Sequence, residues 1–185
     1  TTYCTSFNSK GLHLFMTSSA LKALTATTGN RKDTWNTPPE FVGDVLKFFG
    51  GRVGLDPCSN SAEEPNVPAD KVYTEEMDGL KQSWVADSVF MNHPYSASKT
   101  WIPHAAAQYE NGNAKEMVLL IKLDVSTKWW RSIDKYPWIA VNRRLRFGAA
   151  ASAAPFQSAV IYLGTDLERF KNTFGKYGTC YVPVN

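Results

Sequence analysis

The sequence predicts an α/β fold in which helices flank a twisted, mostly parallel sheet. Short apolar runs rich in β-branched residues alternate along the chain with segments whose apolar residues recur at helical spacing. That alternation is typical of a largely parallel sheet between helices. The 185 residues, of which 43% are hydrophobic and 20% charged, suit one globular domain with a substantial core.

Helical spacing and end signals locate the predicted helices. In residues 38–50 the apolar side chains recur at helical spacing and the segment closes in glycine, which predicts a helix with a glycine stop. Thr37 precedes two prolines and is predicted to cap this helix. A second helix is predicted over residues 100–113, running to an Asn-Gly turn, and a short one over residues 125–136.

Strands are predicted wherever a short apolar run is bounded by turn residues. These runs are 52–56, 69–74, 88–92, 116–124, 138–147, 158–164 and 177–184. The strongest buried-strand pattern is that of residues 116–124. Three of the runs end in a polar side chain, at Asp56, Asn92 and Asp124. Because ligands of parallel α/β sheets bind beyond the carboxyl ends of the strands, these side chains predict a site there.

The Ser- and Thr-rich N-terminus stands apart from this alternation. Residues 1–32 are predicted to form an N-terminal arm or a short accessory helix, and residues 33–185 a single domain. No internal repeat or low-complexity tract divides the second part.

Composition argues against several classes of protein. Three scattered cysteines provide neither a disulfide framework nor a CxxC zinc site. The histidines, at positions 13, 93 and 104, lie too far apart in sequence to predict a metal site. No apolar run approaches the ~18 residues of a membrane span. With no signal peptide visible, a soluble cytoplasmic protein without a metal is expected.

Charge is compatible with a nucleic-acid partner without requiring one, since the net charge is +3. Cationic and aromatic side chains are interleaved over residues 128–147, where cations suit phosphates and rings suit bases. The segment RRLRFG, residues 143–148, is therefore either a phosphate-contacting ribbon or an amphipathic strand with solvated arginines.

The stretch NHPYS, residues 92–96, has the chemistry of a site that binds an aromatic amine. The Asn92 side-chain oxygen can accept a hydrogen bond from an exocyclic amine, the backbone carbonyl of residue 93 can accept a second, and Tyr95 can stack on the base. The same residues are equally consistent with a plain strand-ending Asn-x-Pro turn. The His93 side chain as a general base is a further alternative.

Three other motifs allow a functional and a structural interpretation. Trp35 lies just outside the helix predicted after Thr37, where its ring can face a ligand. Asp56 and the small residues after it either bind the polar groups of a cofactor or form an ordinary turn. The Asp78–Gly79 pair predicts a turn, and Trp84 after it a core residue.

Taken in order, these motifs resemble the phage-type DNA N6-adenine methyltransferase (Dam) family of phage and prophage enzymes. The motifs are W35-N-T-P-P39, G-L-D56, D78-G-L-K-Q-S-W84, N92-H-P-Y-S96, M-V-L-L-I-K122, S126-T-K-W-W130, R144-L-R-F147 and A-P-F-Q-S158. They span residues 33–164. One departure is His93, where the family has proline. It removes a ring that fixes φ, although Pro94 still restrains residue 93, so a working but slower enzyme is expected.

The resemblance implies a Rossmann-like domain that binds S-adenosylmethionine and methylates the N6 amine of an adenine flipped out of DNA. The catalytic loop would comprise Asn92, His93 through its backbone carbonyl, Pro94 and Tyr95. The cofactor pocket would contain Trp35, Thr37, Pro38, Asp56, Pro57, Cys58, Asp78 and Asn92. Contacts to DNA are expected from Ser96, Lys99, Lys128, Arg143, Arg144 and Arg146, although solvated surface charge explains the cations equally well. No metal is needed, and a phage- or prophage-encoded protein in the cytoplasm of a bacterial host is implied.

Two alternatives remain beside this function. The substitution at His93 suggests a methyltransferase fold that binds cofactor or DNA without turnover. The same fold could also act on an RNA base, a cytosine N4 amine or a modified phage base.

Overall fold

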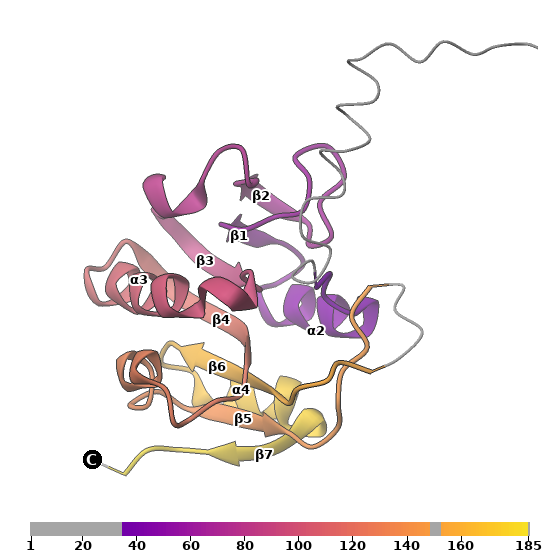
Figure 1. The fold of residues 1–185 in the computed structure, drawn as a ribbon, viewed down its shortest axis with the longest axis vertical. Coiled ribbons are helices and arrows are strands. Elements are labelled where there is room, and N and C mark those ends of the chain that lie inside the picture. Colours follow the sequence, from indigo (N-terminus) through magenta and orange to yellow (C-terminus); the bar gives the residue numbers. More distant parts are fainter. Residues whose placement is uncertain (1–34, 149–152, 185) are drawn as a thin grey trace, which may run out of the picture. The chain divides into compact units, whose positions relative to one another are not determined.

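The computed structural model describes residues 35–148 and 153–184, which belong to one compact unit, Asp33–Asn185 (Figure 1). The predicted N-terminal arm or accessory helix, residues 1–32, lies outside the described residues. The strands of the described part form one seven-stranded sheet in the order β2-β1-β3-β4-β6-β5-β7. Helices lie on both faces of this sheet, which makes the architecture α/β as predicted.

One half of the sheet is parallel. It contains β1 (Val53–Asp56), β2 (Ala69–Val72), β3 (Ala86–Met91) and β4 (Ala114–Lys122), each parallel to its neighbour. Their carboxyl ends therefore meet at one edge of the sheet, as the sequence predicted for Asp56 and Asn92.

The other half is antiparallel, so the prediction of a mostly parallel sheet is wrong. Strand β6 (Ser158–Leu163) lies between β4 and β5 (Trp138–Val141) and is antiparallel to both, and β7 (Gly178–Tyr181) is antiparallel to β5. Parallel neighbours need a crossover connection, usually a helix. The described residues between β5 and β6 contain no helix, so the chain returns in the opposite direction.

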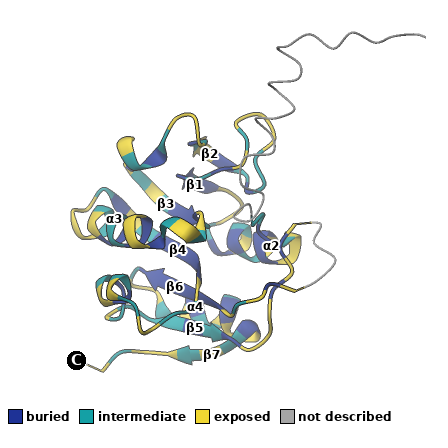
Figure 2. Cartoon of the chain, viewed as in Figure 1, coloured by how far each residue is buried: buried dark blue, intermediate teal, exposed yellow. Residues whose placement is uncertain are grey.

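Both faces of the sheet are buried, because neighbouring side chains of the central strands enter different cores. Val118 of β4 lies in the core beneath α2 (Pro39–Phe48) and α4 (Leu167–Phe174). Leu119, the next residue, lies in the core beneath α3 (Ser98–Glu110). Figure 2 shows the resulting burial of β6 and of the middle of β4, residues 117–121. The strand predicted most strongly, residues 116–124, is thus the central strand β4.

Several predicted boundaries differ from the structure. The segment 125–136 forms only a 3-10 helix, Lys128–Ser132. The strand predicted over 138–147 ends at Val141, because the backbone beyond it bonds elsewhere: Gly148 N–H donates to the Asn36 oxygen at 2.8 Å. Sequence analysis also missed α4. Its signal was an Asp166 N-cap, whose side chain accepts from Arg169 N–H at 3.0 Å.

None of the helices within residues 35–148 and 153–184 combines the length and hydrophobicity that crossing a bilayer requires.

Candidate active site

The candidate site lies where β1 and β3 end. Asp56 is the last residue of β1, and Asn92 follows Met91, the last residue of β3; these strands are parallel neighbours. The third strand-end candidate, Asp124, is engaged locally instead. Its carboxylate accepts from the Ser126 hydroxyl at 2.7 Å, and its backbone oxygen accepts from the side chain of Thr127 at 2.8 Å.

The Asn92 amide is held by a segment far away in sequence. Its nitrogen Nδ2 donates to the Trp35 backbone oxygen at 2.6 Å and to Thr37 Oγ1 at 3.0 Å. A backbone carbonyl can only accept, so the nitrogen must face Trp35 and the oxygen Oδ1 must point the other way. Among the described residues this buried Oδ1 has no hydrogen-bond partner. A buried acceptor without a donor costs about 1–3 kcal/mol, which marks the place where a ligand N–H can bind.

Thr37 does not cap α2, so that prediction is wrong. The helix begins at Pro39 with Pro38 in the capping position, and no side chain caps it. Thr37 is only 2% exposed, and its hydroxyl accepts from Asn92. Thr37 lies one residue before the capping position, and its hydroxyl is engaged by the Asn92 amide instead of by the first turn of the helix. The threonine of the W-N-T-P-P motif therefore positions the Asn92 amide.

The His93 side chain is a structural element of the loop after β3. It is 1% exposed, and its Nε2 lies 2.9 Å from the Ser98 hydroxyl, which itself donates to the Tyr95 backbone oxygen at 2.8 Å. Because serine has one hydroxyl hydrogen and the Tyr95 carbonyl receives it, His93 must be the donor to Ser98. The Nε2 proton is thus committed to joining the loop to the first residue of α3, which argues against a general base acting through Nε2.

Four aromatic rings pack against one another close to the loop that carries Asn92 and Tyr95. Trp35 and Tyr95 belong to segments already predicted to be functional. Phe147 was noted only as one of the aromatic residues of the basic region 128–147, and Phe156 only as part of a motif. Both phenylalanines lie in quoted motifs, R-L-R-F and A-P-F-Q-S, which was the only signal that could have found them. We call these four rings the aromatic box.

Asp56 is a buried carboxylate, 5% exposed, at the end of β1. Its burial raises the pKa of this group to about 7, and hydrogen bonds from Cys58 and Ser59 counter only part of that effect. The Cys58 backbone N–H donates to Asp56 Oδ1 at 3.1 Å. Burial and the nearby Asp56 charge raise the pKa of the Cys58 thiol, while the Asn92 backbone N–H bonds the sulfur and lowers it. Asp56, Cys58 and Asn92 are therefore one cluster.

The Asp78 turn packs against the loop after β1, but its carboxylate points elsewhere. A Cβ atom at Gly79 would lie 1.9 Å from the Pro57 oxygen, so only glycine permits this close approach. Asp78 has a left-handed φ of 53° and pairs with Lys81 at 2.7 Å. Trp84 is fully buried and donates to the Gly79 oxygen at 2.8 Å, which confirms it as a core residue.

The residues predicted to contact DNA are all at the surface, on three separate segments. Ser96 lies in the 3-10 turn Tyr95–Ala97 just before α3, Lys99 is the second residue of α3, and Lys128 begins the 3-10 helix Lys128–Ser132. The arginine segment, residues 143–146, alternates as predicted: Leu145 is buried and the arginines are exposed.

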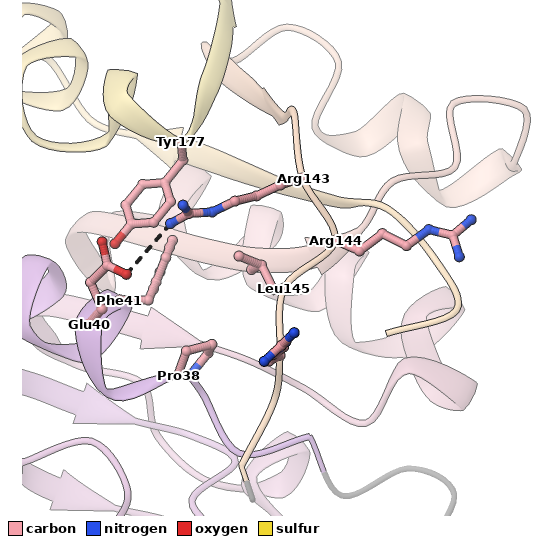
Figure 3. A pocket seen from close by; sticks show the side chains of 8 residues that line it. Pro38, Glu40, Phe41, Arg143, Arg144, Leu145 and Tyr177 are labelled. Carbon is pink, nitrogen blue, oxygen red and sulfur yellow. Dashed lines mark ion pairs between the residues drawn. The ribbon is translucent and has the colours of Figure 1, made fainter. Parts of the chain in front are cut away.

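The arginine segment borders a pocket of about 290 Å³ beside the start of α2 (Figure 3). Arg143 points toward Tyr177 and pairs with Glu40 at 3.5 Å, whereas Arg144 points away from both. Neither Arg144 nor Arg146 has an ion-pair partner within the described part of the chain.

Comparison with known proteins identifies the family of the chain. Residues 24–163 match the family model described as "DNA N-6-adenine-methyltransferase (Dam)". A protein of Escherichia phage T1 named DNA N-6-adenine-methyltransferase is 33% identical over 100 residues, which cover 54% of this chain and 40% of the phage protein. One of the same name from Haemophilus phage HP1 (strain HP1c1) is 32% identical over 104 residues, covering 56% of this chain and 58% of the phage protein.

The matched regions thus span less than two thirds of either relative's own length. The family model nevertheless covers most of the present sequence, including the Trp35 segment, the loop after β3 and the arginine segment. The chain belongs to the DNA N-6-adenine-methyltransferase (Dam) family.

Proposed function

We propose that the chain is a DNA adenine-N6 methyltransferase that transfers a methyl group from S-adenosylmethionine to the amine of a flipped-out adenine. Residues 33–185 are proposed as its Rossmann-like catalytic domain. The observation that carries the proposal is the buried Asn92 Oδ1, which has no hydrogen-bond partner among the described residues. Two hydrogen bonds from the Nδ2 atom of the same side chain fix the orientation of this oxygen. It is the acceptor that an exocyclic amine requires.

In the proposed mechanism the loop after β3 binds and activates the amine. Asn92 Oδ1 accepts one N–H and the backbone carbonyl of His93 accepts the other, which draws electron density toward the nitrogen. The Tyr95 ring stacks on the base and offsets part of the few kcal/mol that unstacking costs. The loop is held in place before the base arrives, by the Trp35–Asn92 and His93–Ser98 hydrogen bonds.

The cofactor is proposed to lie on the Asp56 side of Asn92. When bound, S-adenosylmethionine supplies an electrophilic methyl group. A buried carboxylate with a raised pKa gains from hydroxyl or ammonium donors, so the Asp56 environment fits a cofactor that carries both. In this proposal Pro57 and Cys58 contribute backbone next to Asp56, and Thr37 and Pro38 contribute the neighbouring wall of the cofactor pocket. Asp78 would contribute from the turn that packs on Pro57.

DNA is proposed to lie across the exposed cations near the loop. Ser96 and Lys99 follow the loop directly, and Lys128, Arg144 and Arg146 are the further phosphate contacts. Arg143 is already paired with Glu40, so its contribution is expected to be smaller. As a phage- or prophage-encoded enzyme, the protein would act in the cytoplasm of the bacterial host.

A binder without turnover is less well supported than an enzyme. A binder was considered because position 93 lacks the proline that would restrain the loop. In this chain the buried His93 side chain restrains the loop instead, through its hydrogen bond to Ser98.

The test is incubation of the full chain with methyl-labelled S-adenosylmethionine and unmethylated plasmid or phage DNA, followed by nucleoside mass spectrometry. Label in N6-methyladenine is expected. Label in N4-methylcytosine or only in RNA would reassign the acceptor. Cofactor binding by calorimetry without any transfer, restored in His93→Pro, would identify an impaired enzyme.

A further inference from the structure

The aromatic box has two nearly parallel walls. The rings of Trp35 and Tyr95 lie 6.5 Å apart between centroids, with an interplanar angle of 18°. That separation is at the long end of the range for a directly stacked pair. The centroid distance is the upper limit of the gap between the two ring faces, and a flat base between two rings needs roughly 6.8 Å, twice the ~3.4 Å rise of stacked bases. A base would therefore enter only as the two walls move slightly apart.

The two phenylalanines form the sides of the box. The Phe156 centroid is 5.1 Å from both Trp35 and Tyr95, with its ring nearly perpendicular to each, at 86° and 85°. Phe147 lies 5.6 Å from Trp35 and 6.1 Å from Tyr95, at 72° and 84°. Phe147 and Phe156 thus pack edge-on against both walls. The rings of Trp35 and Tyr95 remain nearly parallel to each other.

The box opens beside the acceptor that the proposed reaction uses. The backbone oxygen of Trp35 accepts a hydrogen bond from the side-chain nitrogen of Asn92, and Tyr95 is three residues beyond Asn92. The hydrogen bond from Gly148 N–H to the Asn36 oxygen, at 2.8 Å, ties the segment that carries Phe147 to the segment that carries Trp35. Trp35, Tyr95 and Phe156 are each partly exposed, so these three side chains border the surface of the described part of the chain.

We propose that Trp35 is the second wall of the slot that receives the adenine, opposite Tyr95, with Phe147 and Phe156 as its sides. This assignment rests on the proposed function and moves the Trp35 ring from the cofactor pocket to the base pocket. The chemistry of the slot selects a flat nucleobase: its walls are aromatic, and Asn92 provides the polar contact at one end. Phe156 packs edge-on against both walls, which limits how far they can tilt relative to each other.

The decisive experiment separates the two pockets. In the full chain, Trp35→Leu is expected to lower kcat/KM for DNA about 10- to 100-fold, the effect of losing one stacked base contact. The dissociation constant of S-adenosylmethionine, measured by calorimetry, is expected to stay within about twofold. Trp35→Phe should recover most of the rate, since it keeps a flat ring. Trp138→Leu is the matched control, because Trp138 stacks on Tyr181 at the far edge of the sheet.

The opposite split would overturn the proposal: weaker cofactor binding in Trp35→Leu with an unchanged kcat/KM for DNA at saturating cofactor. Phe156→Leu provides a second variant should Trp35→Leu fail to fold, with the same expected split. If the unaltered protein transfers no methyl group, the proposed function fails separately. Quenching of tryptophan fluorescence by adenosine then tests the slot. Loss of quenching in Trp35→Phe alone supports it, and equal quenching in the unaltered protein, Trp35→Phe and Trp138→Phe contradicts it.

Discussion

The side-chain nitrogen of Asn92 lies 2.6 Å from the backbone oxygen of Trp35, a residue 57 positions earlier in the chain. This bond joins the start of the described chain to the loop after β3 and orients the Asn92 amide. The free acceptor Oδ1 therefore depends on the conformation of the Trp35 segment, and changes in that segment should alter the reaction without touching the substrate.

Thr37→Val tests that dependence. The variant keeps the shape of the side chain but removes the hydroxyl that accepts from Asn92 at 3.0 Å. We expect the rate of methyl transfer to fall about tenfold and the free energy of unfolding to fall by about 1 kcal/mol, because one buried N–H loses an acceptor. Single-turnover kinetics and urea denaturation measure these quantities. Thr100→Val, at an exposed position on α3, is the control; equal rates for the two variants would refute the role of Thr37.

The His93–Ser98 pair should stabilise the loop as a unit. Ser98→Ala leaves the buried His93 N–H without its acceptor, which costs about 1–3 kcal/mol. Once the imidazole is gone, in His93→Ala, removing the Ser98 hydroxyl should cost less, so the double variant should be less destabilised than the sum of the singles by at least about 0.5 kcal/mol. Urea denaturation of the four proteins completes the cycle, and additive effects would show that the bond does not stabilise the loop. His93→Pro should retain methyl transfer.

Asp56 predicts a pH dependence of stability in the absence of cofactor. Burial raises the pKa of this group from its ordinary value of 3.8 to about 7, so between these pH values the folded state binds more protons than the unfolded state. The contribution of Asp56 to the free energy of unfolding should therefore be most favourable below about pH 4. It should fall by up to about 1.4 kcal/mol per pH unit as the pH rises toward 7.

Asp56→Asn should remove that slope, and urea denaturation at several pH values between 4 and 8 measures it. A cofactor that donates to the ionised carboxylate should also bind more tightly as the pH rises toward 7, in the unaltered protein but not in Asp56→Asn. A slope that is identical in both proteins would assign the pH dependence to other groups.

Arg144 and Arg146, which have no ion-pair partner among the described residues, should determine much of the salt dependence of DNA binding. Arg144→Gln and Arg146→Gln are each expected to reduce the slope of log K against log salt by about 0.9, the contribution of one phosphate contact. Arg143→Gln should change the slope less, because Glu40 already neutralises this side chain. Fluorescence anisotropy at several salt concentrations provides the measurement. The control is Arg52→Gln, which precedes β1 and pairs with Asp70; a similar change there would indicate only an effect of net charge.

Local patterns predicted most of the elements, and long-range pairings account for what they missed. The apolar run of β4 and the periodicity of α2 are visible in any short window of sequence. The antiparallel direction of β6 is a property of the whole sheet, and no window of sequence carries it. Thr37 illustrates the same limit: two prolines beside it suggested a cap, but its partner is Asn92, 55 residues away.

The candidate site was predictable in part for a related reason. Asp56 and Asn92 could be found because strand ends are readable and parallel strands share an edge. Phe147 and Phe156 lie in motifs of the resemblance, but nothing local in the sequence distinguishes a ring that borders a site from a ring of the core. Their arrangement around Trp35 emerges only when three distant segments meet.

The most direct test of the proposed role of Asn92 is methyl transfer to adenine N6 by Asn92→Ala. Removing an acceptor aimed at the reacting group should slow transfer about 100-fold or more. Asn142→Ala, at an exposed position after β5, should transfer at the unaltered rate, and circular dichroism should show both variants folded. A folded Asn92→Ala protein that produces N6-methyladenine as fast as the unaltered chain would contradict the proposed mechanism.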